Sequence, residues 1–432
     1  MKKLLCLLLA LMLVLCGCGK DAQPTEPTAT EPPTEPPTRP VIEVELETQG
    51  AEKYAGVQLQ YWSMLAEDTP DAQVLRQAAA YFAAATGAQV EIHYLDGAEE
   101  LLAQTLAGDL QADIFETSGQ NLKDRFAGYA LDLTELAAAA EYETNSWDVL
   151  RQQAMGRYGT LLGIPYRPYL YGLYYNRDAF DTLGITTYPQ TWAEYLAFCQ
   201  MLKDKGYEAL AMDQERANLI LELHMERALG WDGLKETMVY TNWRGDEMAM
   251  TMIQEAISFA EAGYLVKGNP AVYPAGQNRL GQSNALLVAG SNLLCQEVEE
   301  DCLTSLGWGV FAYPGDGPGN GLLVDADVLA VHASSRNAQA AFDFVMLLTT
   351  GQFDQLRADA TLGIPVDPNN ESPIYGASEA MKQATAQGPK WFPAENNELF
   401  SRLWNGYYKT GAYFANQLNT LSYQFAGEKS VG

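Results

Sequence analysis

The first candidates for catalysis in this 432-residue chain are its three histidines and one serine that stands in a motif-like pattern. His93, His224 and His332 lie far apart and lack the spacing of metal ligands on one helix. Ser283 stands in Gly-Gln-Ser-Asn-Ala, a pattern similar to a nucleophile elbow, and Asp327 and His332 follow it in hydrolase order. An elbow needs a strand before the serine and a helix after it, but here the apolar strand pattern comes after Ser283. We therefore expect no serine hydrolase site.

Acidic residues are the other group with possible chemistry. Asp316, Asn320, Gly321 and Asp327 are spaced in part like a calcium loop, but Pro318 takes a ligand position and no helical pattern flanks the segment. A glycine-rich connecting loop explains these residues better. Paired carboxylates are common in a chain with 55 Asp and Glu, so their proximity in sequence does not identify a glycosidase. The sequence predicts no metal, no cofactor and no enzyme.

The charge balance excludes some partners. With 27 Lys and Arg the formal net charge is −28, whereas a nucleic-acid binder needs a basic face. The same charge argues against docking on anionic lipid by electrostatics alone.

Apolar residues make up 47% of the chain and aromatic residues 11%, enough for packed cores. At roughly 150 residues per domain, the length predicts two or three domains.

The N-terminus predicts the compartment. Two lysines precede an apolar run at residues 4–16, which is shorter than the roughly 20 residues of a membrane-spanning helix. We interpret residues 1–17 as a signal peptide. The closing Leu-Cys-Gly-Cys resembles a bacterial lipobox, which implies cleavage before Cys18 and a lipid on its sulfur; the alternative is ordinary cleavage that leaves Cys18 an idle thiol. Lipidation would place the protein on the outer face of the bacterial cytoplasmic membrane, because several acyl chains give stable anchoring.

A tether follows the anchor. Residues 24–40 contain 7 Pro, 5 Thr and 3 Glu and have no apolar periodicity. Polyproline II geometry, at about 3.1 Å per residue, lets this stretch span roughly 50 Å. We interpret residues 18–53 as a linker that lifts a globular body off the membrane.

Few cysteines remain in the body. Cys199, Cys295 and Cys302 form no disulfide framework and lack zinc-ligand spacing. Cys199 is predicted to be buried on a helix. Whether Cys295 and Cys302 pair is left open by their separation.

The body alternates strand and helix patterns, which predicts an α/β fold. The first series implies a parallel sheet covered by helices. In such sheets ligands lie beyond the carboxyl ends of the strands. Its elements are a strand at 57–62, a helix after Thr69-Pro70 that stops at Gly87, a strand at 90–94, a helix at 99–106 and a strand at 112–115.

A second α/β series follows, and the chain from Gly376 onward is predicted to be helical. The helix at 336–349 is strongly amphipathic. The other expected elements are helices at 192–205, 216–229 and 246–262 and strands at 208–212, 285–289 and 307–312.

Several blocks resemble family 1 extracellular solute-binding proteins, which include the maltose-binding type that serves ABC importers. The central block holds Gly-Ile-Pro-Tyr at 163–166, Tyr-Gly-Leu-Tyr-Tyr-Asn-Arg-Asp-Ala-Phe at 171–180 and Thr-Trp-Ala-Glu-Tyr at 191–195. Leu-Ala-Gly-Asp at 106–109 and Gly-Ile-Pro at 363–365 agree in order. The resemblance covers about residues 57–368.

The resemblance implies a two-lobe periplasmic-binding-protein-like fold with hinge crossovers and a ligand cleft. Closure about a hinge of a few residues would strip water from the ligand. Crossovers are expected near 166–170, 321–325 and 363–368. Lobe 1 would comprise 54–168 plus 323–366, and lobe 2 would comprise 169–322 plus 367–432.

Ligand-binding candidates follow from strand ends and crossovers. Aromatic faces suit sugar C–H groups, while hydroxyls and carboxylates suit sugar hydroxyls. Trp62 and Tyr166 are favoured because they lie where sheet geometry puts ligand. The full set is Trp62, Ser63, Glu116, Ser118, Tyr166, Tyr169, Ser291, Asn292, Asp325 and Trp391.

Each candidate has a structural alternative. Most of the 24 Tyr and 8 Trp must pack within the lobes. Glu116, Ser118 and the Ser291-Asn292 pair could cap helices. Asp325, or its neighbour Asp327, could form a hinge hydrogen bond.

Three functions are compatible with the sequence. The first is a monomeric, lipid-anchored binding protein that delivers a small solute, a sugar or oligosaccharide, to the permease subunits of an ABC transporter. The second is a surface glycoside hydrolase, which would turn over a glycan. The third is an adhesin, indicated by the Pro/Thr tether, which would lack a deep cleft. The ligand's identity is open, because the family also carries polyamines, thiamine, metals and peptides.

Overall fold

The computed structural model describes the globular body and four residues of the predicted linker, 39, 44, 52 and 53. The described residues are 39, 44, 52–108, 112–156, 159–212, 217–240, 243–267, 276–386, 397–404, 407–408 and 410–429. The predicted signal peptide, Cys18 and Trp391 lie outside them. Within this part of the chain, no helix combines the length and apolar character needed to cross a membrane.

Lobe 1 is built on the predicted parallel sheet. Strand β1 (Gln58–Ser63) pairs in parallel with β2 (Gln89–Tyr94) and β3 (Ile114–Ser118). Helix α1 (Pro70–Thr86) begins as expected, because the Thr69 side chain accepts a hydrogen bond from the Ala72 N–H. It ends at Gly87, whose φ of 81° suits glycine.

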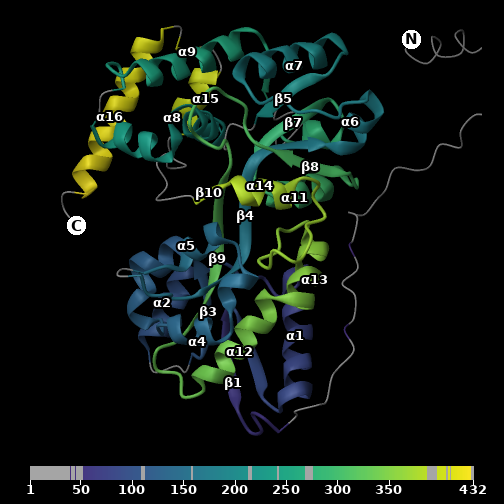
Figure 1. Ribbon diagram of the computed structural model, residues 1–432, viewed down its shortest axis with the longest axis vertical. Helices are drawn as coiled ribbons and strands as arrows, with labels where there is room; N and C mark the ends of the chain where they lie inside the picture. The colour runs from purple at the N-terminus through teal and green to yellow at the C-terminus, as the bar shows by residue number, and fades with distance from the viewer. Residues whose placement is uncertain are drawn as a thin grey trace, which may run out of the picture. The chain divides into compact units, whose positions relative to one another are not determined.

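Helices cover both faces of this sheet. Figure 1 shows α1, α12 (Ala338–Thr349) and α13 (Gly351–Thr361) grouped on one side, although α12 and α13 come from the far end of the chain. On that side the Tyr61 ring meets Phe344 edge-on, with centroids 6.0 Å apart. The remaining helical segments of lobe 1 are α2 (Glu99–Ala107), α3 (Gly119–Asn121), η1 (Leu122–Phe126), η2 (Ala127–Tyr129), α4 (Thr134–Ala139), η3 (Tyr142–Asn145) and α5 (Asp148–Ala154).

Two long strands connect the lobes. Strand β4 (Ile164–Asn176) pairs antiparallel with β9 (Leu323–Val331) as far as Tyr171. From Gly172 it pairs with β7 (Ala285–Gly290), and from Leu173 with β8 (Trp308–Phe311). One continuous strand therefore belongs to the sheets of both lobes, at the first two expected crossovers.

Lobe 2 adds the remaining strands. Strand β5 (Glu208–Met212) pairs in parallel with β6 (Leu265–Lys267) and β7. The strand order is β2-β1-β3-β9-β4-β7-β5-β6, with β10 (Thr385–Ala386) on β9 and β8 on β4. Its helices are α6 (Arg177–Leu183), α7 (Trp192–Asp204), α8 (Ala217–Tyr240), α9 (Glu247–Glu261), α10 (Asn278–Gly281), α11 (Leu293–Cys302), α14 (Ala377–Gln383), α15 (Asn397–Trp404) and α16 (Gly411–Lys429).

Separate cores stabilise the two lobes. One core joins β1–β3 with α1 and α12, and another joins β5, β7 and α7–α9 with the C-terminal helices α15 and α16. A third cluster lies around β4, β8 and the segment near Ile364. These observations confirm the α/β two-lobe fold, while the exact residue boundaries of the lobes stay a prediction.

The three cysteines in the described part of the chain are free thiols. Cys199 is fully buried on α7, as expected. Cys295 and Cys302 lie on α11 as free thiols.

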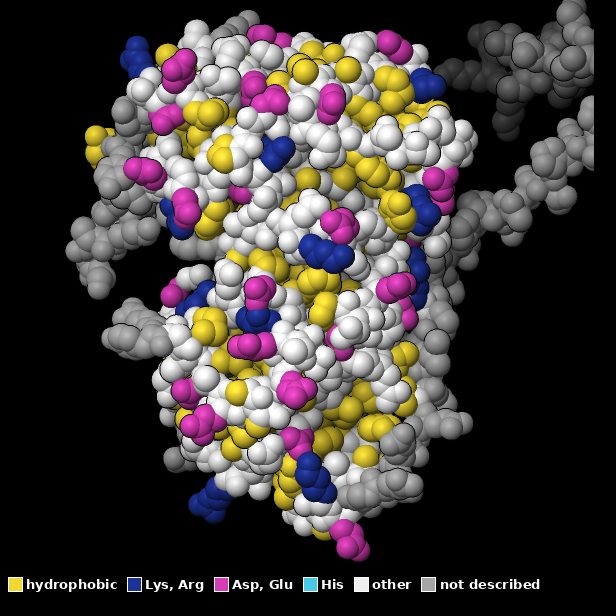
Figure 2. All heavy atoms as spheres, viewed as in Figure 1, with side chains coloured by type: hydrophobic (Ala, Val, Ile, Leu, Met, Phe, Trp, Pro, Cys, Tyr) yellow, Lys and Arg dark blue, Asp and Glu magenta, His cyan; other side chains and the backbone are white. Residues whose placement is uncertain are grey.

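On the face drawn in Figure 2, acidic and basic side chains are interspersed, with no gathering of Lys and Arg.

Candidate functional site

Five polar residues meet where the lobes join, and we call them the crossover cluster: Ser63, Glu116, Arg167, Tyr169 and Asp327. Ser63 ends β1 and Glu116 lies near the end of β3. The other three lie on β4 and β9, which pair Arg167 opposite Asp327. The cluster therefore combines strand ends of lobe 1 with both long strands, the place where ligands bind in open α/β sheets.

Glu116 is the buried centre of the cluster, with no solvent exposure. Its Oε2 accepts hydrogen bonds from the Ser63 hydroxyl at 3.0 Å and from the Met64 N–H at 3.2 Å. Its Oε1 lies 2.5 Å from the Arg167 guanidinium. Burial raises the pKa of Glu116, and the positive charge of Arg167 acts against this shift.

Arg167 links Glu116 to a second carboxylate. Its Nη2 donates to Asp327 Oδ2 at 2.8 Å, and the Tyr169 hydroxyl donates to the same oxygen. Desolvation, and then the Asp327 charge, raise the pKa of Tyr169 well above its usual range, so the hydroxyl stays protonated and remains a donor. Planar guanidinium and carboxylate groups fixed in this way form a rigid polar surface.

Unsatisfied polar atoms surround the cluster. Within the described chain, the Tyr61 and Tyr166 hydroxyls and Asp71 Oδ1 are buried without a hydrogen-bond partner. Burial raises the pKa of Tyr166, and the charges of Asp71 and Glu116 raise it further. Tyr166 is therefore close enough to both carboxyl groups to feel their charge. Buried polar atoms of this kind are costly unless they bind something polar.

The other predicted residues lie outside the crossover cluster. Trp62 is half-buried and stacks on His93, with ring centroids 4.4 Å apart. The Ser118 hydroxyl accepts from the Asn121 N–H at 3.1 Å, which is the capping role we considered. Asp325 is half-buried on β9, and its Oδ1 accepts from the neighbouring Ala326 N–H at 2.9 Å.

Lobe 2 contributes a different kind of contact. Asn292 follows β7, and its Oδ1 accepts from the Leu170 N–H of β4 at 3.0 Å. Ser291 is 8% exposed, and its carbonyl accepts from the Leu294 N–H at the start of α11. The structure thus brings Ser63, Glu116 and Tyr169 together and places Tyr166 beside them. Ser118 and Asp325 border the cluster, because the strands pair Ser118 with Asp327 and Asp325 with Tyr169. Trp62, Ser291 and Asn292 make the other contacts described above.

Sequence reasoning missed Arg167 and named Asp327 only as an alternative to Asp325. Arg167 stands between two prolines inside an apolar stretch. A charged residue in such a stretch must be paired if the stretch is buried, and this signal points to a carboxylate partner.

The catalytic alternatives fall in separate places. Ser283 lies in the turn before β7, within 3.5 Å of the Asn176 amide, while His332 Nδ1 contacts the Ser334 hydroxyl at 2.8 Å. Asp327 belongs to the crossover cluster, so these residues form no triad. Among the described residues, no group of three or more His, Cys, Asp or Glu is placed to hold a metal ion. Asp316 instead accepts from the Trp192 N–H at the start of α7.

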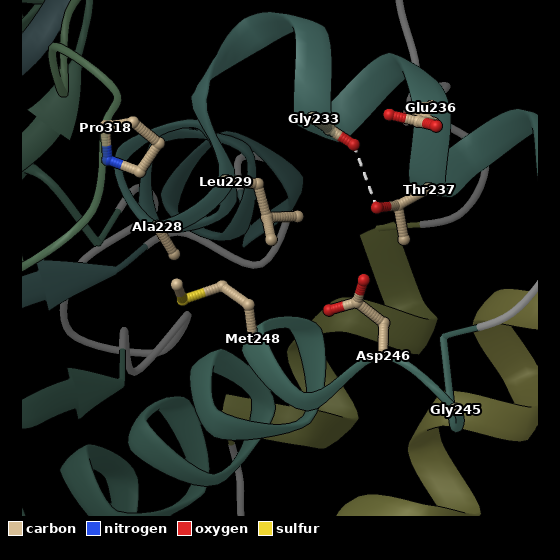
Figure 3. A pocket seen from close by; sticks show the side chains of 9 residues that line it. All are labelled: Ala228, Leu229, Gly233, Glu236, Thr237, Gly245, Asp246, Met248 and Pro318. Atoms are coloured by element: carbon tan, nitrogen blue, oxygen red, sulfur yellow. Dashed lines mark hydrogen bonds between the residues drawn. The ribbon is translucent and has the colours of Figure 1, made fainter.

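A separate hollow of about 390 Å³ lies on lobe 2, between α8, the start of α9 and Pro318 (Figure 3). Two of its polar side chains form hydrogen bonds within their own helices. The Thr237 hydroxyl donates to the Gly233 carbonyl at 2.8 Å, and Asp246 accepts from the Ala249 N–H at 2.8 Å. This hollow includes no residue of the crossover cluster.

With this geometry established, the class of protein is clear from its sequence family. Residues 66–351 match the family described as bacterial extracellular solute-binding protein. The match covers more than half of the chain, so the protein belongs to this family of extracytoplasmic binding proteins.

Particular relatives give a consistent picture. The multiple sugar-binding protein of Streptococcus mutans is 24% identical over 356 residues, covering 71% of this chain and 78% of that protein. Apo RafE from Streptococcus pneumoniae is similar with a TM-score of 0.71 at 16% identity, covering 89% of this chain and 100% of its own. The sugar-binding protein MalE of Xanthomonas citri gives a TM-score of 0.69 at 15% identity, covering 87% and 98%. These solved structures support the fold.

Proposed function

We propose that this protein captures a sugar or oligosaccharide between its lobes and delivers it to an ABC importer. The observation that carries the proposal is the crossover cluster, which fixes carboxylate, guanidinium and phenol groups where β4 and β9 join the lobes. Such groups suit sugar hydroxyls, which both donate and accept hydrogen bonds. The names of the relatives support the same ligand class, including RafE, which has been solved in complex with raffinose.

Binding without chemistry is the activity that the cluster favours. Glu116 and Asp327 share one guanidinium, and Glu116 is also held by Ser63. A glycosidase needs one carboxyl group that gives up a proton to the leaving oxygen and another that attacks or activates water. Glu116 is fully buried and both of its oxygens contact protein groups, so it is poorly placed to reach a scissile bond, and we expect the closed lobes to release the ligand unchanged.

The ligand sites that we propose are those of the sequence: Trp62, Ser63, Glu116, Ser118, Tyr166, Tyr169, Ser291, Asn292, Asp325 and Trp391. Ser63, Glu116 and Tyr169, which belong to the crossover cluster, are the strongest of them, because their orientations are fixed before ligand arrives. Preorganised groups lose little conformational freedom on binding.

The proposed setting is the outer face of the bacterial cytoplasmic membrane, where a monomer is held by lipid on Cys18. The sequence of the leader supports this anchor. Cys18→Ser should move the protein from the membrane fraction to the medium, as judged by immunoblotting of both fractions. A variant that stays membrane-bound to the same extent would show that the anchor lies elsewhere.

A thermal-shift panel tests the function. The panel contains raffinose, stachyose, galactose and maltotriose, with spermidine and glycine as non-sugar solutes. A sugar at about 100 times its dissociation constant should stabilise the native state by about 2.7 kcal/mol and raise the Tm, because it binds only the folded protein. Chromatography of the same samples should show no product. Repeated turnover would favour the hydrolase, and a Tm unaffected by every solute would favour the adhesin.

A further inference from the structure

Arg39, a residue of the predicted tether, lies against lobe 2. Its Nη2 donates to both carboxylate oxygens of Glu299 on α11, each at 3.2 Å. The Arg39 side chain is 32% exposed, whereas the Glu299 side chain is only 4% exposed. The contact therefore reaches from a tether residue to a carboxylate that is almost wholly enclosed by the body.

Glu299 has the features of a guanidinium site. Its Oε1 also accepts from the Leu306 N–H at 2.9 Å and from Trp308 Nε1 at 2.9 Å, which fixes the carboxylate plane. A buried carboxylate is costly unless a cation is paired with it. Among the described residues, the cation paired with Glu299 is Arg39. A planar fork of donors matches a fixed carboxylate better than an ammonium does.

The surroundings of Arg39 come from both lobes. A hollow of about 350 Å³ is lined on the lobe 1 side by the start of α1 and the end of α13, and on the lobe 2 side by α11. Leu362, at the end of α13, immediately precedes the third expected crossover. Arg39, Pro70, Gln73, Glu299 and Leu362 are among the residues that line the hollow.

A second tether residue contacts the other lobe. The Val44 N–H donates to the side-chain oxygen of Gln77 on α1 at 3.2 Å. Arg39 and Val44 are five residues apart, and a fully extended chain spans at most about 3.6 Å per residue, so their Cα atoms cannot separate by more than roughly 18 Å. Two anchors joined by so short a chain limit how far α11 and α1 can move apart.

We propose that Arg39 and Val44 make the end of the tether a strap across the lobe boundary, which restrains the lobes from opening. Arg39 fills a guanidinium site on lobe 2, Val44 holds lobe 1, and the covalent chain between them sets the limit. A pull on the chain before Arg39 would then be transmitted to Glu299 rather than to the start of β1.

The competing explanation is a static surface ion pair, which contributes little to stability and nothing to lobe movement. Distance measurements separate the two. In the full chain with Cys18→Ser and Cys302→Ser, spin labels at Ala80→Cys on α1 and Ala193→Cys on α7 report the interlobe distance, because both positions are exposed on opposite lobes. The measurement uses no ligand, so its outcome does not depend on which solute the protein binds.

Arg39→Ala should lengthen and broaden the distance distribution by several ångströms. Arg39→Lys, which keeps the charge but loses the fork, should have a smaller effect. Glu299→Gln should reproduce Arg39→Ala, since the amide oxygen can still accept from Leu306 and Trp308. Arg402→Ala is the matched control, because Arg402 pairs with Glu398 within α15. An unchanged distribution in Arg39→Ala, with or without a lowered Tm, would overturn the strap.

Discussion

The two lobes differ in what they bring to their junction. Lobe 1 presents ionisable side chains, with buried Glu116 held by Arg167 and Ser63. Lobe 2, at the end of β7, presents the neutral amide of Asn292, which holds the backbone of β4. The two lobes therefore have different roles at the junction: lobe 1 supplies a preorganised polar surface, and lobe 2 holds the connecting strand β4 by a hydrogen bond. Substitutions on each side of the junction test this difference.

The largest effect is expected at Arg167. Arg167→Met would leave Glu116 buried without its counter-charge and should lower the free energy of unfolding by about 3–5 kcal/mol. The matched variant in lobe 2 is Arg279→Met, which breaks a pair with the less buried Glu208 and should lower it by about 1 kcal/mol or less. Urea denaturation of both variants measures the difference. Equal losses would mean that Arg167 contributes no more to the free energy of unfolding than a residue of a partly exposed ion pair does.

Asn292 should give the next largest effect. Asn292→Ala removes the acceptor of the buried Leu170 N–H and should lower the free energy of unfolding by about 1–3 kcal/mol. Asn320→Ala is the control, because the Asn320 amide donates to Thr385 at an exposed position. If both variants unfold at the same urea concentration, the hydrogen bond from Leu170 to Asn292 contributes no more to stability than the exposed one does.

A smaller, pH-dependent effect is expected from the lobe 2 core. Burial lowers the pKa of His224 to about 4 from its usual 6.5, so the unfolded chain binds this proton more readily than the folded protein does. His224 therefore destabilises the protein as the pH falls from 6.5 toward 4, by about 1 kcal/mol at pH 5.5 relative to pH 7.5. His224→Gln should lose less stability than the wild type over that interval in thermal melts. An identical loss would show that His224 does not titrate as its burial indicates.

Much of the fold was predictable because local signals agreed with it. Thr69, Pro70 and Gly87 mark the ends of α1 by capping, φ preference and a left-handed turn, and all three act locally. Strand β5 was predicted at 208–212 and is found at Glu208–Met212. Alternation and caps depend on near neighbours, so one sequence suffices to reveal them.

Strands β4 and β9 were expected only as crossovers. Pro165 and Pro168 interrupt the strand pattern of β4, and the structure accommodates them with a register shift between Pro165 and Arg167. The helix expected at 216–229 continues as α8 to Tyr240 through a break at Gly230, whose φ of 70° is allowed to glycine. Packing between distant segments decides these features, so local patterns missed them.

The candidate site shows the same contrast between residues that local patterns predict and residues that only long-range packing brings together. Strand ends located Ser63 and Glu116, and an expected crossover located Tyr169, because sheet topology alone brings such positions together. The pairing of Arg167 with Asp327 joins residues 160 positions apart, and no local pattern records it. Trp62 stays a prediction for ligand contact, with one ring face covered by His93.

The most direct test is calorimetric titration with the panel sugar that raises the Tm most. Wild-type protein should bind it at one site per chain. Asp327→Asn, which keeps the shape but removes the charge that holds Arg167 and Tyr169, should weaken binding at least tenfold, or about 1.4 kcal/mol. Asp246→Asn, in the lobe 2 hollow of Figure 3, should bind as the wild type does, since asparagine can still cap α9. Loss of binding in Asp246→Asn with full affinity in Asp327→Asn would contradict the account and move the site to lobe 2.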